Sequence, residues 1–532
     1  MFKRTALFIA VAAASALADV TPAPLFTDHA VLQSGMSVPV WGKAEAGEHV
    51  TVTLKDDKGD HKAEADAGPD GKWMAKLDNL ETGSPGTLTI AGKNTITLND
   101  ILVGEVWLAS GQSNMQFGTM IADQKSVDKA NDPELRLFYV PQAGSLTPLD
   151  YLKPDRPMAA KWVVCTRQNL MGAGSWGGFS AVGYFFGKSL REDLKRPVGV
   201  IESSWGGTRS QAWTSVDAFA ADPSTKHYVD EIEKFEKRTD REKMPWFWAD
   251  FGPEKEKWMR EVGNEFNPKL KAWQEETKKA KAADPQAVIP PAPQPSRPSP
   301  DPHFQQAPGI LYNAMIAPLV PYGIKGVIWY QGENNAGGAK EYRDIFPLMI
   351  ADWRNKWGEG NFPFLFVQIA PFRLMGPQIR EAQLMTLAKS PNTAMAVTTD
   401  AGDANDIHPK KKQIVGERLA LAARALAYGE KIEYSGPLYD SVQFDGNKAI
   451  VHFTHVGGGL VAAGEKLRGF TIAGQDGKFV PADAEIAGDT VVVHADGVSD
   501  PKAVAYGWAN VPDVNLYNKN GLPASPFRSN PD

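Results

Sequence analysis

The sequence contains a single cysteine, Cys165, among its 532 residues. One cysteine cannot form a disulfide within the chain, so the fold must be stabilised by its apolar core. Acidic residues (63) outnumber lysine and arginine (57), and the net charge of −6 gives no broad basic surface for nucleic acid. The sequence has no GxxxxGK[ST] loop and no cysteine–histidine cluster at metal-ligand spacing. We therefore expect no nucleic-acid partner, no metal and no cofactor.

Long apolar runs are missing after the first eighteen residues. Lys3 and Arg4 precede an apolar stretch at 6–14, and small residues follow at 16–18. This order is typical of a secretory signal peptide rather than of a buried N-terminal helix, and it predicts cleavage after residue 18 and an exported protein, periplasmic or secreted. Later apolar runs fall short of the ~20 residues of a membrane span, so none is expected.

Residues 20–100 alternate short β-prone runs with turn signals. The turn signals are Asp56–Gly59 and Pro69–Lys72, which are of the kind that close hairpins. The expected strands lie at 38–41, 49–54 and 86–90. Strands at this spacing predict a small β-sandwich-like domain.

From residue 101 to about 430 the pattern changes to strands that alternate with helices. Expected strands are Val103–Ala109, Val198–Ser203, Gly326–Tyr330, Phe364–Ile369 and Ala394–Thr399, and expected helices are Ser180–Lys195, Lys340–Lys356, Gln378–Lys389 and Lys411–Tyr428. This alternation predicts an α/β domain with a parallel sheet that is covered on both faces.

A long insertion is expected inside this domain, at about 224–308. Its first part, 224–284, has helical spacing, and its second part, 285–308, holds nine prolines and should be extended or irregular. From about 431 to 532 the chain is β-prone again, with strands expected at Ala449–Phe453 and Thr490–His494.

Two short motifs carry the residue types of acyl transfer. Gly111-Gln112-Ser113-Asn114-Met115 ends an apolar, strand-like run, which exposes a serine at the carboxyl end of a strand. Asp406-Ile407-His408-Pro409 offers a carboxylate and an imidazole two residues apart. A serine becomes a nucleophile when a histidine takes its proton, and a carboxylate orients that histidine. We therefore predict that these motifs meet.

Further polar groups follow the neighbouring strands. Gly206 and Gly207, in Ser204–Thr208, allow backbone N–H groups to approach a developing oxyanion. Gln331 and Asn334 carry side-chain amides that could donate in the same way. The tryptophans of this region, Trp107, Trp205, Trp213 and Trp329, suit a core better than a sugar-binding surface.

With these residues assembled, the chain resembles the sialate O-acetylesterase family, a carbohydrate esterase branch of the SGNH hydrolases. The matching motifs are Val31–Gln33, Val38–Gly42, Gly111–Met115, Trp205–Thr208, Tyr312–Pro318, Trp329–Ala336, Asp406–Pro409 and Gly521–Arg528. The resemblance implies a three-layer α/β/α SGNH domain flanked by β-rich regions. It also implies a serine esterase that removes O-acetyl groups from carbohydrates through an acetyl-enzyme, without a cofactor.

The resemblance assigns roles to single residues. Ser113 matches the nucleophile and His408 the base. The SGNH pattern is Asp-x-x-His, but Asn405 stands three residues before His408. The acid is therefore Asp406 first, with Asp403, Asp400 or a carbonyl as alternatives. The expected oxyanion donors are the Ser113 backbone, Gly206 or Gly207, and the side chain of Gln331 or Asn334. The expected substrate-binding residues are Gln112, Asn114, Glu333 and Trp205, and the alternative for Glu333 is a buried structural partner of a neighbouring amide.

Two other functions stay open at this point. A glycoside hydrolase would use Glu333 with an aspartate from 400–406, at a separation of about 5–10 Å. A non-catalytic sugar-binding protein would need no contact between Ser113 and His408. The expected substrate is an O-acetylated carbohydrate, either acetylated plant polysaccharide oligosaccharides or O-acetylated sialic acid. The sequence is silent on oligomeric state.

Overall fold

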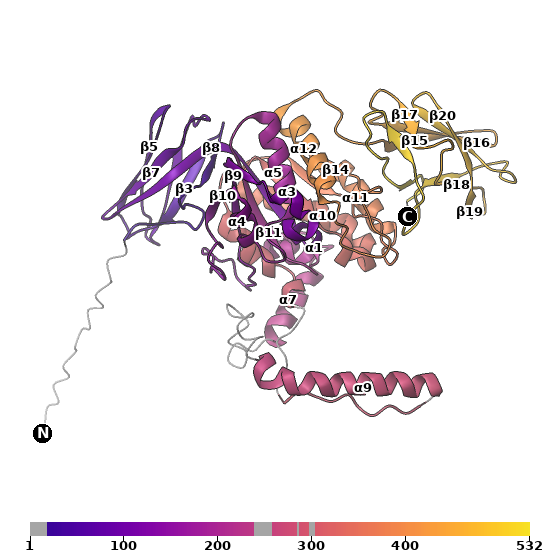
Figure 1. Ribbon diagram of the computed structural model, residues 1–532, viewed down its shortest axis with the longest axis horizontal. Coiled ribbons are helices and arrows are strands. Elements are labelled where there is room, and N and C mark those ends of the chain that lie inside the picture. The colour runs from indigo at the N-terminus through magenta and orange to yellow at the C-terminus, as the bar shows by residue number, and fades with distance from the viewer. Residues whose placement is uncertain (1–18, 239–257, 285–286, 297–303, 532) are drawn as a thin grey trace, which may run out of the picture.

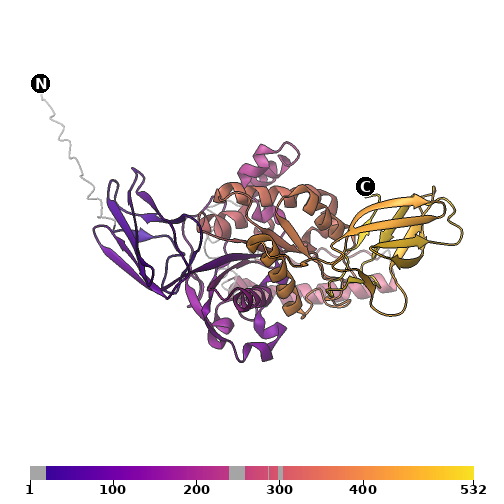
Figure 2. The same cartoon turned by 90° about the horizontal axis from the view of Figure 1, so that it is seen from above.

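The computed structural model describes residues 19–238, 258–284, 287–296 and 304–531. A β-rich N-terminal part, a central part of strands and helices, and a β-rich C-terminal part lie in a row (Figures 1 and 2). The predicted signal peptide, residues 1–18, lies outside the described residues.

The N-terminal part contains two sheets. Its strands are β1 (Thr21–Pro22), β2 (Val31–Gln33), β3 (Val38–Lys43), β4 (His49–Asp56), β5 (Gly59–Asp66), β6 (Lys72–Leu77) and β7 (Gly86–Ala91). β3 pairs with β1 and β6, while β4 pairs with β5 and β7. The predicted turns at 56–59 and 69–72 join β4 to β5 and β5 to β6, so both are confirmed.

Strand β8 (Thr95–Gly111) connects this part to the central sheet. Its first six residues alternate between exposed and half-buried positions and pair with β7, as expected for a sheet that is covered on one side. Its last eleven residues are all buried, which requires cover on both faces. The strand is therefore longer than the predicted 103–109.

The central sheet has the order β10-β9-β11-β8-β12-β13-β14. The remaining bounds are β9 (Asn131–Tyr139), β10 (Trp162–Thr166), β11 (Val198–Ser204), β12 (Gly326–Tyr330), β13 (Phe364–Val367) and β14 (Thr393–Ala396). All neighbours are parallel except β10, which is antiparallel to β9. The sheet is therefore mixed rather than all-parallel, because its edge strand β10 is antiparallel to β9. The sequence pattern predicted neither of these two strands.

Four long helices occupy the predicted positions. They are α5 (Ala181–Leu194), α10 (Ala339–Trp357), α11 (Gln378–Lys389) and α12 (Lys412–Tyr428). The Trp107 ring of β8 meets Phe186 of α5 at 5.0 Å and donates to the Tyr428 hydroxyl of α12. Trp329 of β12 packs 5.8 Å from Trp353 of α10. Trp329 pairs with Ser110, three residues after Trp107, so the two tryptophans point to opposite sides of the sheet.

Short helices fill the connections. They are α1 (Ser113–Gln116), α2 (Thr119–Ala122), α3 (Gln124–Val127), α4 (Arg167–Gly172), α6 (Val216–Ala221), η1 (Ser210–Trp213), η4 (Phe304–Gln306), η5 (Tyr312–Ile316), η6 (Ala317–Leu319) and η7 (Glu333–Gly338). The longer α7 (His227–Arg238) follows α6.

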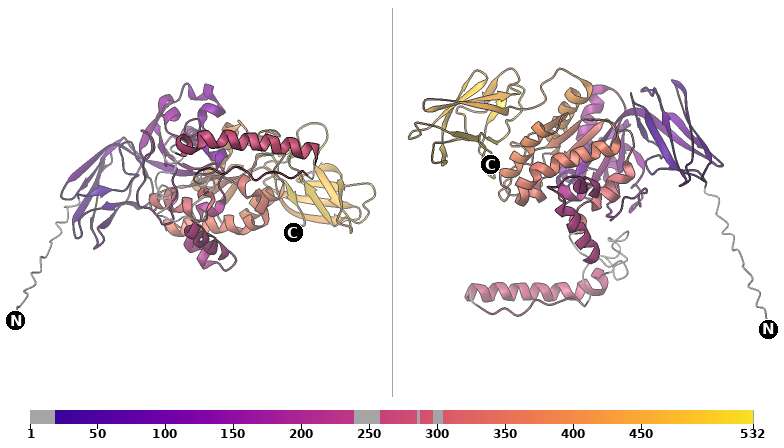
Figure 3. Two further views of the ribbon diagram at one scale, coloured as in Figure 1. Left: turned by 90° about the horizontal axis from the view of Figure 1, so that it is seen from below. Right: turned by 180° about the vertical axis from the view of Figure 1, so that it is seen from behind.

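The long helix of the segment predicted as an insertion lies apart from the central part, below it in the right-hand view of Figure 3. The π-helix η3 (Met259–Gly263) leads into α9 (Asn264–Ala283), which buries none of its residues. Residues 287–296 form neither helix nor strand, and the Pro290 carbonyl accepts a hydrogen bond from the Trp273 indole at 2.8 Å. Residues 227–238 and 259–283 are helical and 287–296 are neither helix nor strand, as predicted, but the predicted irregular part also contains the short 3₁₀-helix η4 (Phe304–Gln306). Residues 239–257, 285–286 and 297–303 of the predicted insertion lie outside the described residues.

The C-terminal part has two four-stranded sheets and one strand pair. Its strands are β15 (Leu438–Asp445), β16 (Lys448–Thr454), β17 (Leu460–Ala462), β18 (Phe470–Ala473), β19 (Phe479–Pro481), β20 (Asp483–Ala487), β21 (Thr490–His494), β22 (Ala503–Tyr506), β23 (Leu516–Asn518) and β24 (Phe527–Arg528). β16 and β21 are the two strands predicted here.

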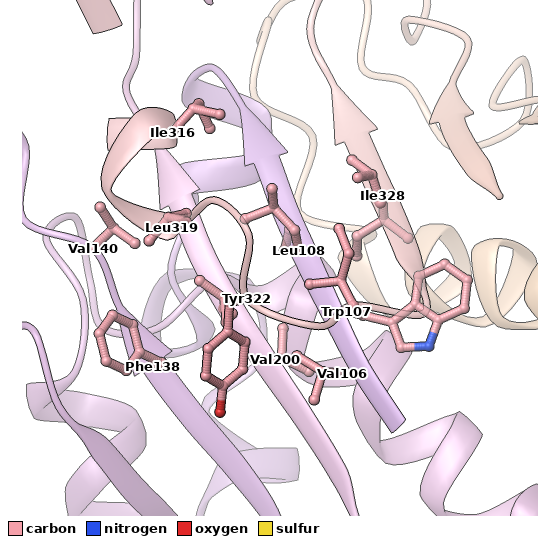
Figure 4. Close-up of a cluster of buried hydrophobic side chains, with 14 of the residues drawn as sticks. Val106, Trp107, Leu108, Phe138, Val140, Val200, Ile316, Leu319, Tyr322 and Ile328 are labelled. Carbon is pink, nitrogen blue, oxygen red and sulfur yellow. The ribbon is translucent and has the colours of Figure 1, made fainter. Parts of the chain in front are cut away.

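The core around β8 is dense with buried apolar side chains (Figure 4). Val106 and Leu108 of β8, Val200 of β11 and Ile328 of β12 are almost fully buried there. Cys165 is buried as a free thiol. In the residues that the structure describes, we find no helix with the length and apolar character that a membrane crossing requires.

We predict that Gly111→Ala destabilises the protein and abolishes activity. Gly111 has φ +137°, and a Cβ there would lie 2.2 Å from the Tyr330 carbonyl oxygen of the neighbouring strand. We expect a loss of about 2 kcal/mol or more in the free energy of unfolding, measured by denaturant titration. The control is Gly446→Ala, at φ +57° with open space around it, which should cost about 1 kcal/mol. Equal losses in the two variants would contradict the steric argument.

Candidate active site

The register of the central sheet brings the predicted motifs to one edge. Gly111 of β8 pairs with Ser204 of β11 on one side and with Tyr330 of β12 on the other, so the three strands end at the same level. The residues after them, at 112–116, 205–208 and 331–335, therefore leave the sheet next to one another.

Ser113 begins the short helix α1 directly after this edge. Its Oγ lies 2.9 Å from Nε2 of His408, although the two residues are 295 positions apart in the chain. His408 stands in the loop between β14 and α12. The structure thus brings together the predicted nucleophile and the predicted base at hydrogen-bonding distance.

The three candidate acids lie in different surroundings. Asp400 forms a bidentate ion pair with Arg418, at 2.6 and 2.7 Å. Asp403 accepts hydrogen bonds from the backbone N–H groups of Asn405 and Asp406. Asp406 is the one near the imidazole, and its carboxylate is 3.9 Å from Nδ1 of His408 and 54% exposed. That distance is longer than a hydrogen bond, so any orienting force from Asp406 here is weak.

Aromatic rings enclose the imidazole of His408. The Trp176 ring contacts it edge-on at 4.9 Å, and the Phe117 ring is roughly parallel to it at 6.4 Å. Burial lowers the pKa of His408, the positive charge of Lys412 lowers this pKa further, and the carboxylate of Asp406 opposes both effects. The surroundings therefore favour the neutral imidazole, which is the form that accepts a proton.

The predicted oxyanion donors differ in what they already bind. The Gly206 N–H donates to the side-chain oxygen of Gln116 at 2.7 Å. The side-chain amide of Gln331 is fully buried and donates to the Thr208 carbonyl and to Asn335. These two donors are therefore engaged within the protein.

The other donors remain near the surface. Asn334 is exposed, and its side-chain amide donates one hydrogen bond to the Gly207 carbonyl at 3.2 Å, which leaves its second N–H without a partner among the hydrogen bonds of the described residues. Gly207, with φ +71°, has open space where a Cβ would be, and among the hydrogen bonds of the described residues none uses its N–H. The N–H of Ser113 lies in the first turn of α1 and has no intrahelical acceptor. The geometry favours these three groups as donors over Gly206 and Gln331.

Two of the four predicted substrate-binding residues, Gln112 and Asn114, are buried, and Glu333 is half-buried with one carboxylate oxygen shielded from solvent. Gln112 accepts from the Asn334 backbone at 3.4 Å, and Asn114 donates to Glu333 at 2.5 Å. Burial raises the pKa of Glu333. Because these side chains bind protein groups and not solvent, the structure gives them internal contacts in place of a sugar-facing surface. Trp205 is partly exposed, and its ring packs edge-on against Phe304.

The buried position of Glu333 also bears on the glycosidase alternative. A glycosidase needs two carboxyl groups that face each other across a sugar. Glu333 lies below the surface, bonded to Asn114, while Asp406 is exposed. This arrangement does not favour a pair of catalytic carboxylates.

Two residues near the pair of Ser113 and His408, called the dyad below, were not predicted as site residues from the sequence. Lys412 is 1% exposed and donates to the side-chain oxygen of Asn114. Trp176 is 37% exposed beside His408. The sequence does not distinguish Lys412 from the neighbouring lysines at 410 and 411, which are exposed. The glycines on both sides of Trp176 indicate a loop, but no local sequence pattern shows that this loop lies next to His408.

Comparison with known proteins identifies the family. A profile described as "Carbohydrate esterase, sialic acid-specific acetylesterase" matches residues 301–425. The sialate O-acetylesterases of Rattus norvegicus and Mus musculus are each 32% identical to the chain, over 78% of it and 75% of their own length. The chain belongs to the sialate O-acetylesterase family. The resemblance read from the motifs is thereby confirmed.

A solved structure supports the same relationship. A carbohydrate acetylesterase from Xanthomonas citri is 36% identical, with a TM-score of 0.75, and the match covers 96% of this chain and 99% of that one. Both β-rich parts and the central part of this sialate O-acetylesterase family member thus lie within the matched length.

We predict that this sialate O-acetylesterase family member still hydrolyses esters at mildly acidic pH. Because the pKa of His408 is lowered, the imidazole stays neutral below the ordinary value of about 6.5. The acidic limb of kcat/KM should therefore lie below pH ~6.5, measured with an uncharged acetyl ester. Titration of labelled histidines by NMR, with His408→Gln to assign the signal, checks the same group. An inflection at or above pH 6.5 in both measurements would contradict this environment for His408.

Proposed function

We propose that the protein is a serine esterase that removes O-acetyl groups from carbohydrates through an acetyl-enzyme. The observation that carries the proposal is the 2.9 Å contact between Ser113 Oγ and His408 Nε2 at the end of β8. Membership of the sialate O-acetylesterase family supports the reaction and the substrate class. No metal enters the proposal, because Ser113 needs a base and not a Lewis acid.

The reaction follows from these two side chains. His408 takes the proton of Ser113 as Oγ bonds to the acetyl carbonyl carbon. The tetrahedral intermediate collapses when the sugar oxygen leaves with the proton from His408, and an acetyl-serine remains. His408 then takes a proton from water, the hydroxide attacks the acetyl group, and acetate leaves as Ser113 regains its proton.

The negative charge of each intermediate needs donors that are already in place. We assign this role to the N–H groups of Ser113 and Gly207 and to the side-chain amide of Asn334. The N–H groups of Ser113 and Gly207 have no other acceptor among the described residues, and Asn334 lies at the surface, which supports this choice. Donors fixed in advance stabilise the oxyanion without reorganisation during the reaction.

We propose Asp406 as the group that supports the imidazolium, with an electrostatic rather than a hydrogen-bonded contact. Its distance of 3.9 Å from Nδ1 supports a modest contribution. The same carboxylate accepts the backbone N–H of His408 at 2.9 Å, which fixes the loop between them.

The substrate we propose is an O-acetylated carbohydrate, from acetylated plant polysaccharide or from O-acetylated sialic acid. The relatives carry names of both kinds: sialate O-acetylesterase and carbohydrate acetylesterase. The partly exposed rings of Trp176 and Trp205, next to His408 and to the Gly206 loop, are suited to pack against a sugar ring.

Three further assignments belong to this proposal. The central part, 101–430, is an SGNH three-layer domain, supported by the opposite directions of Trp107 and Trp329 toward different helices. It lies between β-rich domains at 20–100 and 431–532, with an insertion at about 224–308. The protein is exported after removal of residues 1–18, as the basic and apolar order of that segment indicates.

We predict that Ser113→Ala lowers acetate release by about 10⁴-fold or more, because the variant has no covalent route. Acetate is measured in parallel with acetylated hemicellulose oligosaccharides and with O-acetylated sialic acid. Activity toward one substrate identifies the sugar class. Intact mass spectrometry of rapidly quenched wild type should show one added acetyl group.

The matched control is Ser499→Ala, an exposed serine in the C-terminal part, which should keep full activity. Acetate release by Ser113→Ala at the wild-type rate would overturn the nucleophile assignment.

We predict a smaller effect for Asp406→Asn. A triad aspartate that is buried and bonded to the histidine contributes about 10⁴-fold to kcat. Because Asp406 is exposed and 3.9 Å away, we expect a loss of roughly ten- to a hundredfold in kcat. Steady-state kinetics of this variant measure the loss. A 10⁴-fold loss would show that Asp406 moves into a direct hydrogen bond when substrate binds.

A further inference from the structure

Asn114 is a junction between the two halves of the dyad. Its side-chain oxygen accepts a hydrogen bond from Nζ of Lys412. Its side-chain nitrogen donates to Glu333 at 2.5 Å and to the backbone carbonyl of Ile407 at 3.0 Å. The side chain is 1% exposed, so these contacts are made away from solvent.

The chain positions of these partners give the junction its importance. Asn114 directly follows Ser113, and Ile407 directly precedes His408. The hydrogen bond from the Asn114 side chain to the Ile407 carbonyl therefore connects the residue after Ser113 to the backbone before His408. Asp406, in contrast, holds the imidazole only at 3.9 Å. In addition to the contact between Ser113 and His408, the Asn114 side chain thus connects the nucleophile loop to the base loop.

Lys412 enters this junction from the first turn of α12 as a buried cation. Its ammonium lies 4.8 Å from the centre of the Phe117 ring and 5.3 Å from that of Tyr330. Burial lowers the pKa of Lys412 to about 7, against the attraction of Glu333 and Asp406. An ammonium taken out of water at such a cost requires an opposite charge and hydrogen bonds nearby.

Glu333, from η7, supplies that charge on the other side of Asn114. One of its oxygens accepts from Asn114, and the other has no hydrogen-bond partner among the described residues. Burial raises the pKa of Glu333, while Lys412 opposes that rise. The two charges therefore depend on each other, because removal of either leaves the other buried alone.

The groups that face Lys412 come from four elements. Phe117 and Asn114 belong to α1 and its end, Tyr330 to β12, Glu333 to η7, and Asp406 and His408 to the loop before α12. Among them His408 is the group whose protonation the reaction changes. A positive charge at Lys412 opposes a second positive charge on the imidazole.

We propose that Lys412 is a positioning residue of the esterase: through Asn114, with Glu333 as its buried counter-charge, it holds the Ser113 loop against the His408 loop and keeps the imidazole neutral before attack. The inference rests on the proposed function, since it concerns the same dyad. It gives the buried cation of α12 a role in a reaction that the proposed function assigns to Ser113 and His408.

The test compares Lys412→Met, Glu333→Gln and the double variant with the wild type. We expect Lys412→Met to lower kcat by about ten- to a hundredfold, because the dyad distance is no longer fixed, with KM changed by less than about twofold. The acidic limb of kcat/KM should move to higher pH, because the ammonium that opposed protonation of His408 is gone. The matched control is Lys410→Met, an exposed lysine two residues away, which should keep both values.

The double variant separates the effect on the dyad from the effect on folding. Each single variant leaves one buried charge uncompensated and should lower Tm, while the double variant leaves none and should recover part of it. Its acidic limb should stay at the higher pH, because the ammonium is still missing. If Lys412→Met does not fold, this double variant gives the same measurement of the pH profile.

The outcomes distinguish this inference from the proposed function. Acetate release at the wild-type rate by Ser113→Ala, or no release by the wild type, would reject the function itself. A wild type that requires Ser113, together with a Lys412→Met variant of unchanged kcat and unmoved pH profile, would reject only the role of Lys412. A loss of kcat that follows Tm in every variant, without a shift of the acidic limb, would also reject it.

Discussion

The parallel alignment of β8 with its two neighbours is the constraint on which the rest of the site depends. Gly111, Ser204 and Tyr330 stand side by side across the sheet, so three segments far apart in the chain leave it at one level. The alignment requires a glycine at 111, because the backbone of Tyr330 occupies the space of a side chain. The buried tryptophans 107 and 329 fix the same strands to helices on either side.

The chemistry at this edge combines a half-buried pair, Ser113 and His408, with a more deeply buried support. Ser113 and His408 are half-buried and lie 2.9 Å apart, while Asn114 and Lys412 beside them are buried and Glu333 is half-buried. A low dielectric strengthens the interactions of that support and makes each unpaired charge costly. Loss of one of these buried partners should therefore strongly destabilise the protein. With all of them present, the positions of Ser113 and His408 are fixed closely.

Several weak contacts, rather than one strong hydrogen bond, orient the imidazole of His408. Asp406 is too distant for a hydrogen bond to the ring, and rings of Phe117 and Trp176 confine the imidazole from the sides. The backbone of residues 406–408 is fixed by the Asp406 carboxylate and by Asn114. Orientation by packing and backbone contacts is consistent with a sequence in which the Asp-x-x-His spacing is absent.

The sequence by itself determined the strand and helix pattern, the family, and the serine and histidine, because these depend on local periodicity and on short motifs. It left the acid among three aspartates, because a choice between Asp400, Asp403 and Asp406 depends on Arg418 and on a loop conformation. It missed β9 and the edge strand β10. The sequence left the role of Glu333 open between a catalytic group and a structural partner of an amide, and the structure shows its hydrogen bond with Asn114. The pairing of Lys412 with Asn114 was decided only by the tertiary structure, because the cost of burying a charge arises only where distant segments exclude water around it.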